Sequence, residues 1–201
     1  MINRVKLGEV LDIKRGASLC GDFYSTQGEY IRLTLGNFNY PNGGFKENTA
    51  KDDIYFLGKV RKEFILNKGD IITPLTEQAA GLLGETALIP ESNKYIQSGD
   101  VGLVLPKRGK LDSSFCYYLL SSQSIKKQLG AAAQQTKIRH TSPDKIKDCI
   151  AFIPEIVQQE KIGKILLSID KQIQRNNEMV QKLPLINHAA FFSKGGTTYV
   201  C

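Results

Sequence analysis

A run of amides and cations between residues 134 and 140 has the composition of a nucleic-acid contact. It consists of Gln-Gln-Thr-Lys-Ile-Arg-His, so amide, ammonium, guanidinium and imidazole groups follow closely on one another. Glutamine can pair with the edge of adenine, while arginine and lysine favour guanine edges or phosphate oxygens. We therefore predict that this segment contacts DNA through Gln135, Lys137, Arg139 and His140.

Two further polar segments add candidate donors. A loop expected between two strands contains Thr76 and Gln78. The turn-rich segment 36–44 contains Asn39, and Arg32 stands shortly before it. Each segment alone has the composition of an ordinary surface loop. Taken with the first segment, they extend the predicted DNA-facing set to Arg32, Asn39, Thr76 and Gln78.

The basic charge is concentrated in one part of the chain. The whole sequence has 27 Lys and Arg against 20 Asp and Glu, a net charge of +7. Residues 101–150 alone contain nine basic and three acidic side chains. A solvated helix face would explain this excess, and so would a phosphate-rich partner whose counterions are released on binding. No apolar run approaches the ~18 residues of a membrane span, which excludes an integral membrane protein.

Candidate catalytic and metal-binding groups are sparse. The sequence has neither a Walker-type phosphate loop nor a G-x-G-x-x-G motif. His140 and Cys149 could form a nucleophile pair, but Cys149 stands among apolar residues, as core cysteines do. The scattered cysteines and histidines predict no zinc site and no disulfides, which fits a cytoplasmic protein. We expect no catalytic residue, metal or cofactor; a small hydrolase that uses His140 remains an alternative.

Short strands and later helices must position these groups. The segments up to residue 110 alternate weakly and are separated by turns, which predicts a bent, mixed β-sheet rather than repeated β-α-β units. A helix is expected from Asp112 or Ser113 to about Leu129, then a helical turn at 141–145 and a strand at 150–153. The fold class is therefore α+β. The expected strands of the first part are Leu7–Lys14, Glu29–Leu35, Phe64–Leu66, Asp70–Thr73, Thr86–Ile89 and Val101–Leu105.

A long helix with a heptad seam is predicted after Pro154. The seam has one polar member, Asn176, of the kind that fixes the register of paired helices, and Pro184 is expected to end or kink the helix. Coiled-coil pairing is favoured over an amphipathic helix that packs on its own domain. The resulting division is a domain at 1–153, a helix at 154–183 and a short helical or flexible tail at 184–201. The seam residues are Ile162, Leu166, Ile169, Ile173, Asn176, Val180 and Leu183.

Several segments together resemble the specificity (S) subunits of type I restriction-modification systems, over about Val5 to Leu183. Their order along the chain is the order found in that family. The chain departs from the family in having Gln158-Gln159 where Glu-Gln is common, and in having one unit where the usual subunit has two in tandem. The segments that carry the resemblance are Gly28–Arg32, Lys68–Thr73, Gly81–Pro90, Phe115–Leu120, Gln135–Ile138 and Ile153–Ile162.

The resemblance implies a non-catalytic target-recognition domain followed by a spacer helix. In that family the domain binds half of a bipartite site in double-stranded DNA. The helices of two units pair antiparallel and dock methyltransferase (modification) subunits, while the restriction subunit is an indirect partner. A single unit would then act as a homodimer through the seam. The competing interpretation is a dimeric DNA-binding regulatory protein without a methyltransferase partner.

Overall fold

The protein consists of two units, Met1–Gly163 and Lys164–Cys201. The computed structural model describes residues 2–77, 83–132 and 139–193. The boundary falls inside α5 (Ile156–Ser193), so the first two turns of this helix belong to the first unit. The sequence had placed the division at residue 153, before the helix begins.

A four-stranded antiparallel sheet forms the centre of the first unit. Its strand order is β2-β10-β6-β8, with β10 paired to both β2 and β6. The strands predicted near residues 70, 86 and 101 are confirmed as β6, β8 and β10. The single strand expected at Leu7–Lys14 is wrong, because Leu7 and Val10 bury the same side of a helical turn, α1, before the strand begins. The bounds are α1 Leu7–Val10, β2 Leu11–Arg15, β6 Ile71–Pro74, β8 Ala87–Leu88 and β10 Val101–Pro106.

A second four-stranded sheet is mixed and has very short strands. Its order is β3-β5-β4-β9, and only the β4–β9 pair of these is parallel. The strand expected at Glu29–Leu35 stops at Arg32, since the Thr34 hydroxyl accepts a hydrogen bond from the amide of Gly36 (3.2 Å) and caps a 3₁₀ turn. The strand expected at Phe64–Leu66 is reduced to an isolated bridge between Ile65 and Ile96. The bounds are β3 Tyr24–Ser25, β4 Tyr30–Arg32, β5 Tyr55–Phe56 and β9 Tyr95–Ile96.

Two further strand pairs join distant parts of the sequence. β1 (Ile2–Lys6) pairs antiparallel with β12 (Ile150–Pro154), which was predicted as a strand. β7 (Thr76–Glu77) pairs antiparallel with β11 (Arg139–His140). The first pair brings the start of the chain beside the residues that precede α5.

The helices between β10 and β12 are shorter than predicted. In place of one helix to Leu129 there are α2 (Ser113–Leu120) and α3 (Gln123–Ala132). The break follows from Ser121, whose hydroxyl donates to the carbonyls of Tyr117 and Tyr118 (3.3 and 3.2 Å) and so competes with helix continuation. The predicted helical turn is confirmed as α4 (Pro143–Lys147), with Ser142 as its N-cap.

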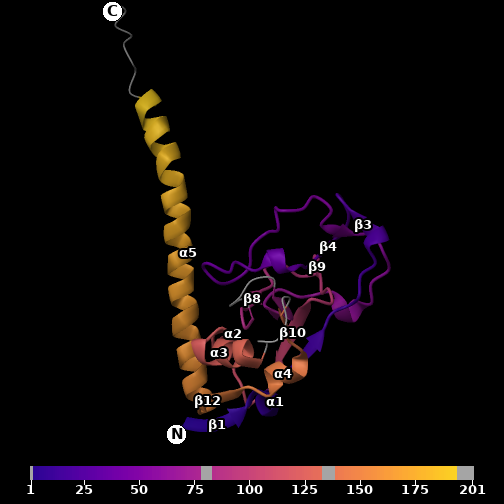
Figure 1. Ribbon diagram of the computed structural model, residues 1–201. Coiled ribbons are helices and arrows are strands. Elements are labelled where there is room, and N and C mark those ends of the chain that lie inside the picture. Colours follow the sequence, from indigo (N-terminus) through magenta and orange to yellow (C-terminus); the bar gives the residue numbers. More distant parts are fainter. Residues whose placement is uncertain (1, 78–82, 133–138, 194–201) are drawn as a thin grey trace, which may run out of the picture. The chain divides into compact units, whose positions relative to one another are not determined.

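The central sheet buries apolar side chains on both faces. Neighbouring Ile71 and Ile72 of β6 belong to different core clusters, as alternation along a strand requires. One cluster contains residues of α1 to α4, and the other contains Leu33 and Phe38 from the chain that follows β4. In Figure 1, α2, α3, α4 and the β1–β12 pair lie at one end of this unit, β3, β4 and β9 lie at the other, and β8 and β10 lie between them. The α+β class predicted from the sequence is confirmed.

A buried glutamine fixes the start of α5 to the first unit. Gln159 is 1% exposed. Its side-chain oxygen accepts from the amide of Asp112 (3.0 Å), and its side-chain nitrogen donates to the carbonyls of Pro154 (2.9 Å) and Lys110 (3.3 Å). One turn later, a Cβ on Gly163 would lie 2.8 Å from the amide nitrogen of Phe115, so only glycine allows this close approach to α2.

α5 continues to Ser193, so Pro184 does not end the helix, and the alternative that it kinks the helix stays a prediction. Proline removes one backbone donor and costs roughly 3 kcal/mol inside a helix, but the bonds of the flanking residues can carry the helix past it. Among the described residues, no helix is both long enough and apolar enough to cross a membrane.

We predict that Gln159→Ala lowers the free energy of unfolding by about 2–4 kcal/mol, because buried backbone groups would lose their hydrogen-bond partner. The matched control is Gln158→Ala, since Gln158 is exposed and should change stability by less than about 0.5 kcal/mol. Urea unfolding followed by circular dichroism measures both. Equal stability of the two variants would contradict the role assigned to Gln159.

Candidate nucleic-acid interface

The β7–β11 pair brings two of the predicted polar segments together. Thr76 pairs with His140, and Glu77 pairs with Arg139, although the two strands are far apart in the sequence. The loop after β7 and the segment before β11 therefore leave the pair at the same end. Gln78, Gln135 and Lys137 lie outside the described residues, as do the side chains of Arg139 and His140. Their predicted DNA contacts stay predictions.

Thr76 is held in place by the turn that precedes β10. Its hydroxyl donates to the carboxylate of Asp100 (2.9 Å), and the carbonyl of Asp100 accepts from the amide of Leu75 (2.8 Å). The carbonyl of Leu75 in turn accepts from the amide of Thr141 (2.9 Å). With 8% of its surface exposed, Thr76 is mostly buried. This network fixes the backbone from which both polar segments depart.

The same end of the central sheet carries residues that the sequence analysis missed. β2 and β6 end where β10 begins, since Arg15 pairs with Gly102 and Pro74 pairs with Val101. At this end the backbone of Gly16 passes close to the backbone of Gln97 and Ser98. A Cβ atom on residue 16 would lie 2.3 Å from the carbonyl oxygen of Ser98. The one signal in the sequence is a glycine directly after two basic residues, which alone does not indicate such a crossing.

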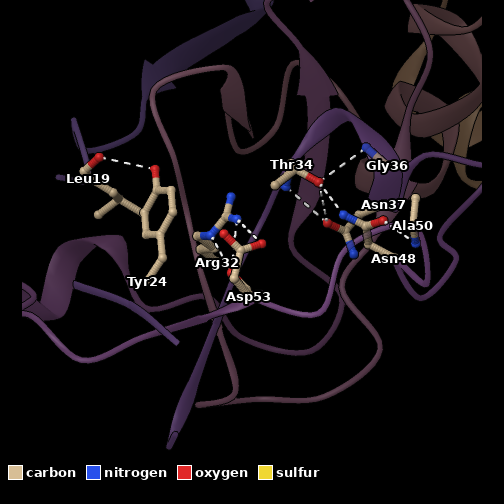
Figure 2. Close-up of polar contacts among 9 residues, drawn as sticks. All are labelled: Leu19, Tyr24, Arg32, Thr34, Gly36, Asn37, Asn48, Ala50 and Asp53. Carbon is tan, nitrogen blue, oxygen red and sulfur yellow. Dashed lines mark hydrogen bonds and ion pairs between the residues drawn. The ribbon is translucent and has the colours of Figure 1, made fainter. Parts of the chain in front are cut away.

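Arg32 is used inside the domain. Its guanidinium donates through Nε and Nη2 to the carbonyl of Asp53 (3.1 and 2.9 Å), and Nη2 also contacts the Asp53 carboxylate (3.2 Å). It lies 3.7 Å from the centroid of the Tyr24 ring, as Figure 2 allows the reader to follow. Only 5% of the residue is exposed. A DNA contact by Arg32 would require this arrangement to open.

Asn39 lies in a segment that an asparagine network orders. Thr34 donates its amide to Asn37 Oδ1 (2.9 Å), and its hydroxyl accepts from Asn48 Nδ2 (2.9 Å), as Figure 2 shows. The amide of Asn39 donates to the carbonyl of Gly44 (2.9 Å), and its side chain is partly exposed. Arg32 and Asn39 thus belong to the second sheet and its following loop, not to the β7–β11 pair.

Part of the basic excess of residues 101–150 is bound within the domain. Lys126 forms an ion pair with Glu85, which is 8% exposed. Lys147 contacts the carboxylates of Asp144 (2.9 Å) and Asp12 (3.6 Å). Lys107 donates to the carbonyl of Gly8. These side chains stabilise the fold, so the local charge alone is a poor guide to the DNA-facing surface.

Cys116 and Cys149 have the properties of core residues. Burial raises the pKa of the Cys116 thiol to about 12 and also raises the pKa of Cys149. A thiol nucleophile must ionise, and these environments oppose ionisation. Among the described residues, no three His, Cys, Asp or Glu side chains are grouped so that they could hold a metal ion. The hydrolase alternative depends on His140, whose side chain lies outside the described residues, so that alternative stays a hypothesis.

The comparisons with known proteins point to one family. Residues 2–185 match the sequence model of the type I restriction modification DNA specificity domain. A curated relative, the type I restriction enzyme MjaVIII specificity subunit of Methanocaldococcus jannaschii, is 25% identical over 186 residues. That match covers 89% of this chain but 42% of the relative.

Solved structures share the fold. The S subunit of the type I restriction-modification system from M. genitalium superposes with a TM-score of 0.63 at 17% identity, over 90% of this chain and 42% of that one. The HsdS subunit from Thermoanaerobacter tengcongensis gives a TM-score of 0.57 at 16% identity, over 87% and 38% of the two chains. This chain therefore spans less than half the length of each of these three relatives.

We predict that Arg32→Gln lowers the free energy of unfolding by about 2–3 kcal/mol, because the buried charged hydrogen bonds and the contact with Tyr24 are lost. Arg15→Gln is the control, since Arg15 is exposed at the end of β2 and should leave stability within about 0.5 kcal/mol. Denaturant unfolding checks both. A fully stable Arg32→Gln protein with weakened DNA binding would instead support the original prediction for Arg32.

Proposed function

The chain belongs to the type I restriction modification DNA specificity domain family, and from that premise we propose that it is the DNA-recognition unit of a type I restriction-modification complex. It binds one half of a bipartite site in double-stranded DNA, in the cytoplasm. Methyl transfer and cleavage take place on other subunits, so this chain supplies sequence recognition without a catalytic residue or cofactor of its own.

The observation that carries this proposal is the meeting of two polar segments at the β7–β11 pair. A DNA sequence is recognised by hydrogen-bond donors and acceptors that reach the edges of the nucleobases in the grooves, and a rigid backbone must hold these groups in register. The hydrogen bond between Thr76 and Asp100 helps to make the backbone rigid here. Gln78, Gln135, Lys137, Arg139 and His140 provide the side chains that we propose for base and phosphate contacts at this pair, together with Thr76. Asn39 would add a contact from the loop that follows the second sheet.

Exposed apolar residues on α5 support pairing of two helices. Ile169, Ile173 and Val180 are 44%, 53% and 63% exposed, and Ile162 is 38% exposed. A continuous apolar stripe of this kind is costly in water and is the usual signature of a helix partner. Asn176 is exposed on the same stripe, Leu166 is partly buried, and the side chain of Leu183 lies outside the described residues.

A homodimer would restore the two-unit arrangement. The chain spans 42% of its M. jannaschii relative. Two copies of the chain would therefore supply the two recognition units that we propose for the complex. A dimer with two-fold symmetry presents the same recognition surface twice, and its target would be an inverted repeat with a fixed, unspecified gap. The paired helices would also dock the methyltransferase subunits, and the restriction subunit would join through them. Co-purification with a methyltransferase subunit separates this function from that of a stand-alone DNA-binding regulator.

We predict that Ile173→Glu converts the dimer to monomers and abolishes tight binding to the bipartite site, because a carboxylate would be buried at the centre of the seam. Sedimentation velocity and DNA titration measure the two effects. Ser168→Glu is the control, since it adds the same charge to an exposed position of α5 outside the seam. A stable dimer of the Ile173→Glu protein would place the interface elsewhere.

We also predict that one heptad inserted after Ile169 lengthens the gap between the two half-sites by about 3 base pairs and leaves the half-sites unchanged. Seven residues add roughly 10 Å of helix, and each base pair spans about 3.4 Å. Selection of binding sites from a random DNA library measures the gap for both proteins. An unchanged gap would contradict the assignment of α5 as the spacer.

A further inference from the structure

A small cavity lies beside the candidate interface and has a basic rim. It has a volume of about 240 Å³, and residues 17–19 form one wall. Phe56, Phe64 and Val60 provide an apolar lining, while Lys59 and Arg61 are the charged residues that line it. Both cations are exposed. This combination of two cations and an apolar floor is not explained by the β7–β11 pair or by α5.

One turn connects this cavity to the candidate interface. Ala17, in the cavity wall, forms a bridge with Ser98, and its amide donates to the carbonyl of Gln97 (3.0 Å). Two residues further on, Asp100 accepts the hydrogen bond from the Thr76 hydroxyl. The cavity and the β7–β11 pair are thus held by opposite ends of the same short turn, at the same end of the central sheet.

Lys59 and Arg61 are placed so that they could bind an anion. The Arg61 guanidinium lies over the Phe64 ring, 4.8 Å from its centroid, which restricts its orientation. Arg61 also contacts the carboxylate of Glu63 (2.9 Å), but both side chains are more than half exposed, so this ion pair is weak and can exchange for a phosphate. Among the described residues, Lys59 forms no ion pair with a carboxylate.

We propose that this cavity binds the sugar-phosphate backbone of DNA next to the half-site, with Lys59 and Arg61 on one or two phosphates and the deoxyribose against the apolar floor. This inference rests on the proposed function. The volume is below the roughly 300 Å³ at which pockets begin to enclose a whole drug-sized ligand, which favours a phosphate with part of a sugar over a complete nucleotide. Ser18 is the one neutral polar side chain in the lining, so the cavity lacks the amides that would distinguish base edges.

The test compares Lys59→Gln, Arg61→Gln and the double variant with the unchanged full chain. Two duplexes of equal length are titrated over a range of salt concentrations, one with the selected site and one of random sequence. Each lost phosphate contact should reduce the slope of log K against log salt by about 0.9, and the affinity for both duplexes should fall by the same factor. Lys68→Gln is the control, because Lys68 is exposed in the turn before β6, at the opposite end of the sheet.

The outcomes separate this inference from the proposed function. Unchanged affinity and salt slope in the double variant, with site-specific binding intact, would overturn the inference alone. A loss confined to the selected duplex would mean that these residues contact bases, which also overturns it. Failure of the unchanged protein to bind either duplex would overturn the proposed function and the inference with it.

Discussion

The side-chain amide of Gln97 holds together the part of the structure on which the proposed DNA recognition depends. It is 1% exposed, and its nitrogen donates to the carbonyls of Lys14 (2.6 Å) and Val101 (2.8 Å) in the central sheet. Gln97 itself directly follows β9 of the second sheet. One residue therefore links the two sheets at the point where Gly16 crosses the chain. The turn that positions Thr76 and the wall of the basic cavity both begin at this link.

Two other glutamines, one partly buried and one fully buried, bond to the backbone in the same way. Gln128 of α3 donates to the carbonyl of Ile150 and accepts from its amide, both at 2.8 Å, as a neighbouring strand would. Gln159 does the same for the backbone at the start of α5. Very short strands leave many backbone groups without a ladder partner, and an unsatisfied buried group costs free energy. Glutamine has a donor and an acceptor on one flexible side chain, so it can replace the missing strand.

The sequence predicted the features that local patterns determine. The bounding turn residues identified β10, the Ser-Pro pair identified α4, and the order of several segments identified the family. Contacts between residues that are far apart in the sequence could not be predicted from it. Two-residue strands such as β5 have no periodicity to detect, and the burial of Arg32 depends on Asp53, which stands in an ordinary charged loop. For the candidate site, the sequence predicted two polar segments but not their pairing through Thr76 and His140.

α5 carries residues that pack on the first unit and residues that we propose for pairing with a second helix. Gln159 and Gly163 are four residues apart and face the recognition domain, where the glycine allows contact with α2. The exposed stripe through Ile169 and Ile173 lies about a quarter of a turn away, at roughly 100° per residue. The partner helix that we propose would therefore contact side chains other than those of Gln159 and Gly163. Because the polar segments that we propose for DNA contact adjoin β7 and β11 in the sequence rather than α5, changes of target sequence there need not disturb the helix contacts.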